Sequence, residues 1–134
     1  MIQRKLVKTL SAAAILFGIA SLAAAQSEPK TTLTKLYKSY EKHGRSSLDM
    51  PEFGKRFVFS GVVVQVSSSL RGAALIRAAD VGGDRELARL TPASNAESQK
   101  IASMVSGATF NAACEVGVAS NSVYITLQGC VFQP

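Results

Sequence analysis

The sequence predicts a mainly β domain, in which five strands form a small barrel with one helix before the strands and one helix between the third and the fourth. Three observations lead to this prediction. The longest expected strand changes the parity of its apolar alternation at a glycine, as a bent strand does. A helical pattern interrupts a series of short strands. A second change of parity near Gly129 brings the two cysteines into register.

The first 25 residues have the composition of a secretory signal peptide. Its basic start contains three cations, Arg4, Lys5 and Lys8. An apolar stretch over residues 10–20 follows, and small residues then provide a cleavage site after Ala25. The apolar stretch is shorter than the roughly 20 residues of a membrane-spanning helix, and residue 26 is not the cysteine that a lipid anchor needs. We therefore predict a periplasmic or secreted protein with no membrane span after cleavage.

Cleavage lowers the positive charge of the chain. It shortens the chain from 134 to 109 residues, removes three of fifteen Lys and Arg and none of nine Asp and Glu, and lowers the net charge from +6 to +3. This small excess is typical of an ordinary soluble surface rather than of a nucleic acid footprint. About 100 residues suffice for one hydrophobic core without a metal. We place an N-terminal helix and connector in residues 26–54 and the barrel in residues 55–134.

Residues 31–43 have an amphipathic pattern that predicts a helix. The spacing i, i+3, i+4 and i+7 collects four apolar side chains on one face, Leu33, Leu36, Tyr37 and Tyr40. Charged side chains occupy the other face, and Gly44 follows where a helix ends. We expect the tyrosine-bearing face to dock this helix on the barrel.

Residues 56–66 predict one long, bent strand. Phe57 and Phe59 alternate at odd positions, whereas three valines alternate at even positions after Gly61. A shift of one residue exchanges the two faces of a strand, as a β-bulge does, and glycine is the residue expected there. We therefore place a bulge at Gly61, because a small barrel needs a strand that bends far enough to pair on both sides of its closure.

Two short strands are expected in the middle of the chain. The first covers residues 73–78 and the second covers residues 86–90, with a polar loop over 67–72 before them and a glycine-rich turn over 80–84 between them. Pro92 lacks the N–H group that continues a ladder, so we expect the second of these strands to stop before it.

A second helix is expected over residues 95–106. Ser94 and Glu97 have the spacing of a capping box, in which each side chain accepts a hydrogen bond from the backbone N–H of the other residue. Gly107 stands where such a helix ends. The apolar face comes from Ile101, Met104 and Val105.

The last two strands are predicted to form a hairpin. Residues 109–118 and 122–132 both alternate between apolar and polar positions, with a turn at Asn121–Ser122. The apolar parity of the second strand changes near Gly129, which we interpret as a second bulge. The resulting register places Val118 opposite Ile125, Val116 opposite Leu127, Cys114 opposite Cys130 and Ala112 opposite Phe132.

The two cysteines, Cys114 and Cys130, are predicted to form a disulfide, because an oxidising compartment favours the pairing of a lone even set. Two buried free thiols are the alternative. A metal site has less support, since the chain has no C-x-x-C spacing and its one histidine, His43, lies about 70 residues before Cys114.

The order of the expected elements is that of the OB-fold, a five-stranded Greek-key barrel with a helix between the third and fourth strands. Four features also carry a family resemblance: GKRFVFSGVV at residues 54–63, SGATF at 106–110, Cys114, and VYITLQGC at 123–130. In these features the chain resembles the bacterial tRNA_anti-like family of exported OB-fold domains, over residues 33–132. The resemblance implies the OB-fold and implies no particular activity, since most members of this family lack an assigned one.

The sequence contains no recognisable enzyme motif. A nucleophile–base–acid triad would need His43, the only imidazole, at the end of the first expected helix. Asp80, Asp84 and Glu86 cluster around the glycine-rich turn without the ligand spacing of an EF-hand, and Gly54–Lys55 lacks the rest of a phosphate-binding loop. We predict a non-enzymatic protein without a metal or a cofactor.

Binding is the function class that remains. OB-folds bind ligands on strands 2 and 3 and on the loops after strands 1 and 4, which selects the candidate residues Arg71, Arg77, Arg89 and Asn121. Strands 2 and 3 contain no aromatic residue for base stacking, and Tyr124 is the one aromatic of the sheet expected to point outward. We expect an exported module that binds a protein, a glycan or another small ligand. The alternatives are a nucleic acid-binding OB domain, which export and composition disfavour, and a secreted hydrolase inhibitor.

Overall fold

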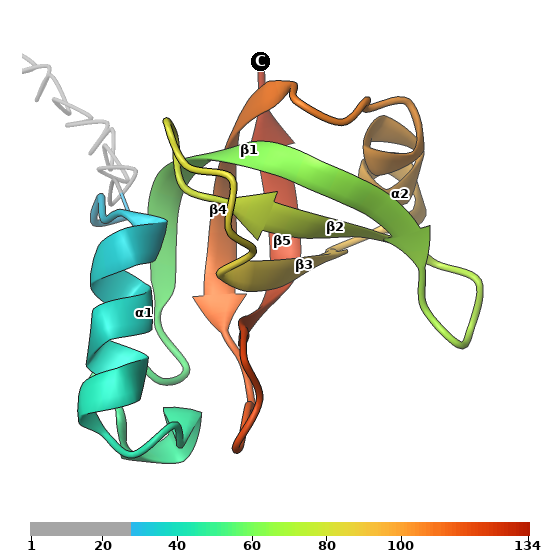
Figure 1. The fold of residues 1–134 in the computed structure, drawn as a ribbon. Helices are drawn as coiled ribbons and strands as arrows, with labels where there is room; N and C mark the ends of the chain where they lie inside the picture. The colour runs from blue at the N-terminus through green and yellow to red at the C-terminus, as the bar shows by residue number, and fades with distance from the viewer. Residues whose placement is uncertain (1–27) are drawn as a thin grey trace, which may run out of the picture.

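A computed structural model describes residues 28–134 of the chain (Figure 1). The expected signal peptide, residues 1–25, therefore lies outside the described residues. The elements in chain order are α1 (Leu33–Lys42), the 3-10 helix η1 (Ser47–Asp49), β1 (Arg56–Ser68), β2 (Ala74–Ala79), β3 (Ala88–Pro92), α2 (Asn95–Ala102), β4 (Thr109–Val116) and β5 (Ile125–Gln133). Within this part of the chain, each helix is too short or too polar to span a bilayer.

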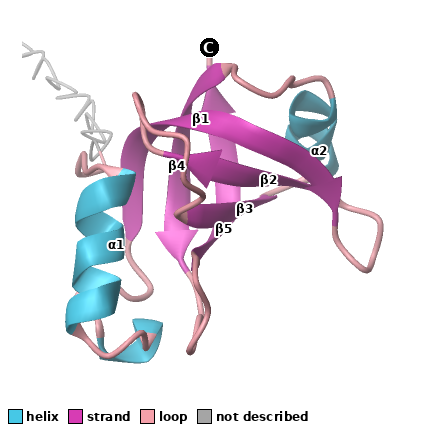
Figure 2. Cartoon of the chain, viewed as in Figure 1, coloured by secondary structure: helices cyan, strands magenta, loops and turns pink. Residues whose placement is uncertain are grey.

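The strands form a closed barrel in the order β1-β2-β3-β5-β4, and β4 pairs with β1 to complete it. Strands β3 and β5 run parallel, and the other neighbouring pairs are antiparallel. Figure 2 shows α1 and α2 at two opposite sides of this barrel. The predicted fold class is confirmed: the domain is a mainly β, closed barrel of OB-like strand order, with α2 between β3 and β4 and with an N-terminal helix.

Strand β1 pairs with two neighbours. Its first half, Arg56 to Val62, pairs with β4, and its second half, Val62 to Ser68, pairs with β2. The predicted bulge at Gly61 is wrong, because the ladder to β4 continues through Gly61 without a shift and the register changes between Val63 and Gln65 instead.

The position of the bulge follows from burial along β1. Phe59 and Val63 point into the core with 3% and 1% of their surface exposed, so odd residues still face inward beyond Gly61. Val66 then packs against the core after the shift. Valines at three successive positions, 62 to 64, place apolar side chains on both faces of the strand, so their pattern does not locate the extra residue.

Gly61 serves packing rather than bending. A Cβ atom at this position would lie 2.6 Å from Cζ of Phe110 and 3.2 Å from the carbonyl oxygen of Ala79. The Phe110 ring meets the edges or faces of two further core rings, with centroid distances of 6.2 Å to Phe59 and 5.8 Å to Phe132. The glycine therefore leaves the space that the central ring of this aromatic cluster occupies.

The predicted bulge in β5 is confirmed. Val116 lies opposite Leu127 and Ala112 lies opposite Phe132, and the register shifts between these pairs. Gly129 sits at the shift with φ of +59°, a value that glycine tolerates best. The shift brings Cys114 and Cys130 together at disulfide distance, with Cα atoms 4.3 Å apart and both residues buried.

The turn of the last hairpin differs from the prediction. Strand β4 ends at Val116 and β5 begins at Ile125, so the connection is a longer loop over residues 117–124 and not a tight turn at Asn121–Ser122. Val118 is 61% exposed and does not face Ile125 in the ladder. The loop pairs instead with the segment before η1, through a bridge between Ser46 and Ser120.

The boundaries of β3 and α2 also differ from prediction. Strand β3 begins at Ala88 instead of residue 86 and includes Pro92, which lies at its last position opposite Cys130 of β5. Helix α2 ends at Ala102 instead of residue 106, so Gly107, with φ of +89°, does not cap it. Val105, expected on the apolar face of this helix, lies beyond its end and is 68% exposed.

The capping pattern of α2 is half confirmed. Ser94 Oγ accepts a hydrogen bond from Glu97 N at 3.3 Å. The Glu97 carboxylate does not return this bond, because it accepts one from Phe132 N of β5 at 2.9 Å and one from Lys100 Nζ at 2.9 Å. These two bonds, that from the Phe132 N–H above all, hold the pKa of Glu97 below its ordinary value. The carboxylate thus joins α2 to the barrel.

Helix α1 docks through the predicted face, and Leu33, Leu36, Tyr37 and Tyr40 are all buried. Tyr37 Oη donates a hydrogen bond to Val123 O at 3.2 Å. Tyr40 Oη lies 3.1 Å from Ser122 O, to which it donates, and accepts from Ser122 N at 3.1 Å. The helix therefore holds the loop between β4 and β5 in place.

We expect Gly61→Ala to destabilise the domain by about 1–3 kcal/mol, the usual cost of overpacking a filled core. Gly117→Ala is the matched control, because its Cβ would meet only the side chain of Gln128, at 2.8 Å, and that side chain is exposed and flexible. Chemical denaturation measures both free energies of unfolding. Equal losses in the two variants would contradict the packing role of Gly61.

We expect peptide mapping without reductant to recover Cys114 and Cys130 in one linked fragment. Replacing both by alanine should lower the free energy of unfolding by about 3 kcal/mol, because the bridge closes a loop of about 17 residues in the unfolded chain. Recovery of both thiols in alkylated form from unreduced, exported protein would contradict this prediction.

Candidate functional site

The structure brings two of the four candidate ligand-binding residues together. Arg77 of β2 and Arg89 of β3 are direct partners in the antiparallel ladder, and both lie on the outer face of the barrel. Arg71 is exposed in the loop between β1 and β2. Asn121 lies in the loop between β4 and β5 with φ of +54°, and its N–H donates to Arg45 O at 2.9 Å.

Glu86 joins the two arginines. Its Oε2 lies 3.0 Å from Arg77 Nη2, and its Oε1 accepts from Arg89 Nε at 2.8 Å. Arg77 Nη1 also donates to Gln65 Oε1 of β1 at 2.9 Å. The Glu86 side chain is 18% exposed, whereas the side chains of Arg77 and Arg89 are 35% and 32% exposed. The carboxylate is therefore largely covered and the two guanidinium groups remain accessible.

An aromatic ring supports the second arginine. The guanidinium carbon of Arg89 lies 3.9 Å from the ring centroid of Tyr124, which is a close cation–π contact. Arg89 uses its Nε for Glu86, and its two Nη atoms donate to no other residue in the range 28–134. We refer to Gln65, Arg77, Glu86, Arg89 and Tyr124 as the arginine cluster.

The arginine cluster is charged at neutral pH. Burial raises the pKa of Glu86, but hydrogen bonds from Arg89 and Arg77 outweigh this effect and hold the pKa below its ordinary value. The hydrogen bond to Glu86 raises the pKa of Arg89. Two cations around one carboxylate leave a net charge of +1. A flat guanidinium with two free Nη atoms can bind a carboxylate or a phosphate through paired hydrogen bonds.

The acidic residues near the glycine-rich turn do not form a common site. Asp80 accepts hydrogen bonds from Thr34 N at 3.0 Å and from Val81 N at 2.8 Å, so it joins the turn to the start of α1. Glu86 belongs to the arginine cluster. In the described part of the chain, no three His, Cys, Asp or Glu residues gather as metal ligands would. His43, which follows the last residue of α1, donates through Nδ1 to Ser39 O at 2.7 Å.

Sequence reasoning missed Glu86 and Gln65 as members of the site. Strand pairing could have identified Gln65, because Gln65 pairs with Arg77 and Arg77 pairs with Arg89, so the three residues form one row across three strands. Glu86 stands three residues before Arg89 and reaches both cations from the turn. The outward direction expected for Tyr124 agrees with its contact to Arg89.

Comparison with known proteins gives one structural match. The fold is similar to the crystal structure of a "putative nucleic acid-binding lipoprotein" from Klebsiella pneumoniae, with a TM-score of 0.63 and 16% sequence identity over 83% of this chain and 96% of that chain. At this identity the match shows the fold alone. No protein-family model and no curated protein matches the sequence.

We expect Glu86→Gln to lower the free energy of unfolding by about 1 kcal/mol at pH 7, since it removes the charge that holds two partly exposed cations. The folded pKa of Glu86 is lowered, so its stabilisation is present above the ordinary value of about 4.3 and is lost as the pH falls through the folded pKa. The difference between variant and parent should therefore shrink on acidification.

Glu41→Gln is the matched control, because Glu41 is exposed on α1 and forms no ion pair with another residue of the described range. Denaturation curves at several pH values provide the comparison. A Glu86→Gln effect that is constant from neutral to acid pH would show that the ion pairs contribute nothing.

Proposed function

We propose that this chain is an exported, non-enzymatic binding module that recognises an anionic group of a protein, a glycan or another small ligand through the arginine cluster. The observation that carries the proposal is the arrangement of Arg89. Its guanidinium rests on the ring of Tyr124 at 3.9 Å and is fixed by Glu86 at 2.8 Å, while both Nη atoms stay free within residues 28–134. A cation held in this way loses little side-chain entropy on binding.

Three features support export. The buried cysteine pair at disulfide distance fits an oxidising compartment. The expected signal peptide agrees with this compartment, and the name of the structural neighbour describes a lipoprotein. The resemblance to the tRNA_anti-like family is part of the same proposal and rests on the motifs quoted above.

The non-enzymatic part of the proposal rests on how the chemically active side chains are used. His43 donates to the carbonyl of Ser39 in α1, one turn earlier. Asp80 binds the start of α1, and Glu86 neutralises arginines. These contacts give each of the three a structural partner in place of a reacting group.

Nucleic acid binding is the second candidate. It is favoured by the name of the structural neighbour and by two partly exposed arginines on the face that OB-folds use. It is weakened by the absence of aromatics in β2 and β3 and by the position of Arg89 over the ring of Tyr124, where a base would stack.

Titrations with three labelled probes distinguish these functions: a polyglutamate peptide, a phosphorylated mannan oligosaccharide, which contains no uronate, and a single-stranded thymidine oligonucleotide. We expect saturable binding of the peptide or the oligosaccharide, and no binding of the oligonucleotide even at low salt. Arg89→Gln should weaken the binding by about tenfold, and Arg77→Glu with Arg89→Glu should abolish it.

Lys38→Glu is the matched control, because it reverses an exposed charge on α1 outside the arginine cluster. Salt-dependent binding of the oligonucleotide that is lost in the arginine variants would select the second candidate. If neither acidic probe binds, or if Arg89→Gln binds as the parent does, the proposed role of the arginine cluster is wrong.

A further inference from the structure

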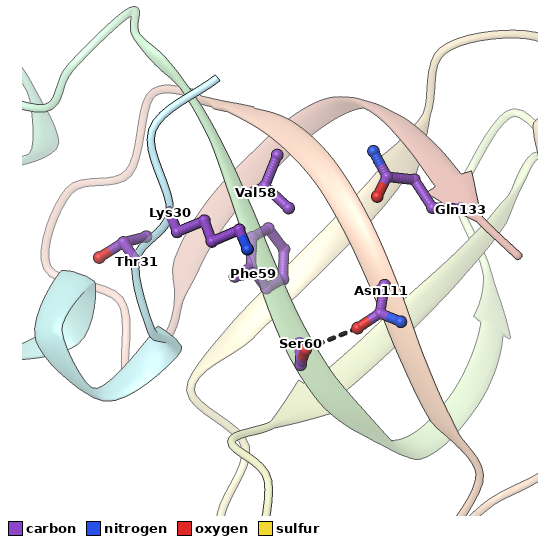
Figure 3. A pocket seen from close by; sticks show the side chains of 7 residues that line it. All are labelled: Lys30, Thr31, Val58, Phe59, Ser60, Asn111 and Gln133. Carbon is purple, nitrogen blue, oxygen red and sulfur yellow. Dashed lines mark hydrogen bonds between the residues drawn. The ribbon is translucent and has the colours of Figure 1, made fainter. Parts of the chain in front are cut away.

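A second hollow lies on the outer face of the barrel over β1 and β4 and shares no residue with the arginine cluster (Figure 3). Its volume is about 330 Å³, at the small end of the range for ligand pockets. This volume accommodates a ligand of single-sugar size. Its lining consists of Lys30, Thr31, Val58, Phe59, Ser60, Asn111 and Gln133.

Three polar residues, one from each of three neighbouring strands, form a row along this hollow. Ser60 of β1 lies opposite Asn111 of β4, and Asn111 lies opposite Gln133 of β5. The next row on the same face is apolar and consists of Val58, Ala113 and Val131. Of this row, Val58 lines the hollow. Polar groups beside this apolar side chain suit a ligand that has hydrogen-bonding groups at its rim and an apolar ring face.

The hollow offers hydrogen-bond donors. Ser60 Oγ donates to Asn111 Oδ1 at 2.6 Å, as the dashed line in Figure 3 shows, so the Asn111 acceptor is engaged and its amide N–H groups are available. Lys30 Nζ forms no ion pair with other residues of the described range. Donors and one cation therefore lie beside the apolar side chain of Val58.

The backbone holds Lys30 at this position. The segment before α1 lies beside β1 as a short parallel bridge, in which Thr31 N donates to Val58 O and Val58 N donates to Pro29 O, both at 2.9 Å. An ion pair between Glu28 Oε1 and Arg56 Nε, at 3.0 Å, attaches the residues just before Lys30 to β1 as well. Figure 3 shows the Lys30 side chain extending from this segment across β1.

We propose that this hollow binds a small ring-bearing carboxylate of the uronate class. An ionised carboxylate only accepts hydrogen bonds, so it complements the Lys30 ammonium and the Asn111 amide. The ring of the ligand would cover Val58 and present hydroxyl groups to Gln133. The proposal concerns residues outside the arginine cluster and does not depend on the proposed function.

Titration with sodium glucuronate, followed through ¹⁵N–¹H spectra of the exported protein, tests the site. We expect the side-chain amide signals of Asn111 and Gln133 to shift and saturate at millimolar ligand. Glucose, which has the ring without the carboxylate, and acetate, which has the carboxylate without the ring, should each bind at least about tenfold more weakly. An equal response to either of them, or no shift of these signals, would overturn the proposal.

Two variants locate the response, and two controls should leave it unchanged. Lys30→Gln and Asn111→Asp should each weaken glucuronate binding by about tenfold, since one removes the cation and the other replaces N–H donors by a repelling charge. Lys38→Gln, an exposed lysine of α1, is the matched control and should bind as the parent does. Arg89→Gln should also leave glucuronate binding unchanged, which separates this site from the proposed function. Unchanged binding in Lys30→Gln would show that the site is wrongly assigned.

Discussion

The double pairing of β1 is the constraint on which the rest of the structure depends. One strand gives its first half to β4 and its second half to β2, and Val62 pairs on both sides, with Thr109 and with Ala79. The extra residue between Val63 and Gln65 lets the strand bend without exposing its apolar face. Each half of β1 contributes to one surface of the closed barrel. The arginine cluster lies over the second half of β1, and the hollow of Lys30 lies over the first half.

The N-terminal segment completes this arrangement from outside the barrel. Residues 29–31 pair with the first half of β1, along the edge that β2 leaves free. Helix α1 follows this segment and contacts two loops. Its tyrosines hold the loop between β4 and β5, while Asp80 and Arg85 tie the turn between β2 and β3 to the helix. These two loops are thereby fixed by side-chain hydrogen bonds to α1.

Local residue patterns predicted the structural features that depend on neighbouring residues alone. Alternation, the glycine at 129 and the cysteine pair fixed the register of β4 and β5, because each signal points to the same pairing. The valine run of β1 could not locate its bulge, since apolar residues on both faces look alike in sequence. The end of α2 and the loop after β4 depend on tertiary contacts, such as that of Glu97 with β5. The same holds for the site: topology places Arg77 near Arg89, but the role of Glu86 requires the ladder between β2 and β3.

Interstrand NOEs from Val62 test the double pairing most directly. We expect the backbone protons of this one residue to show NOEs both to Thr109 of β4 and to Ala79 of β2 in the same folded species, with sequential NOEs that place the extra residue at position 64. Contacts to one neighbour alone would mean an open sheet, and a bulge found at Gly61 would contradict the packing assigned to that glycine.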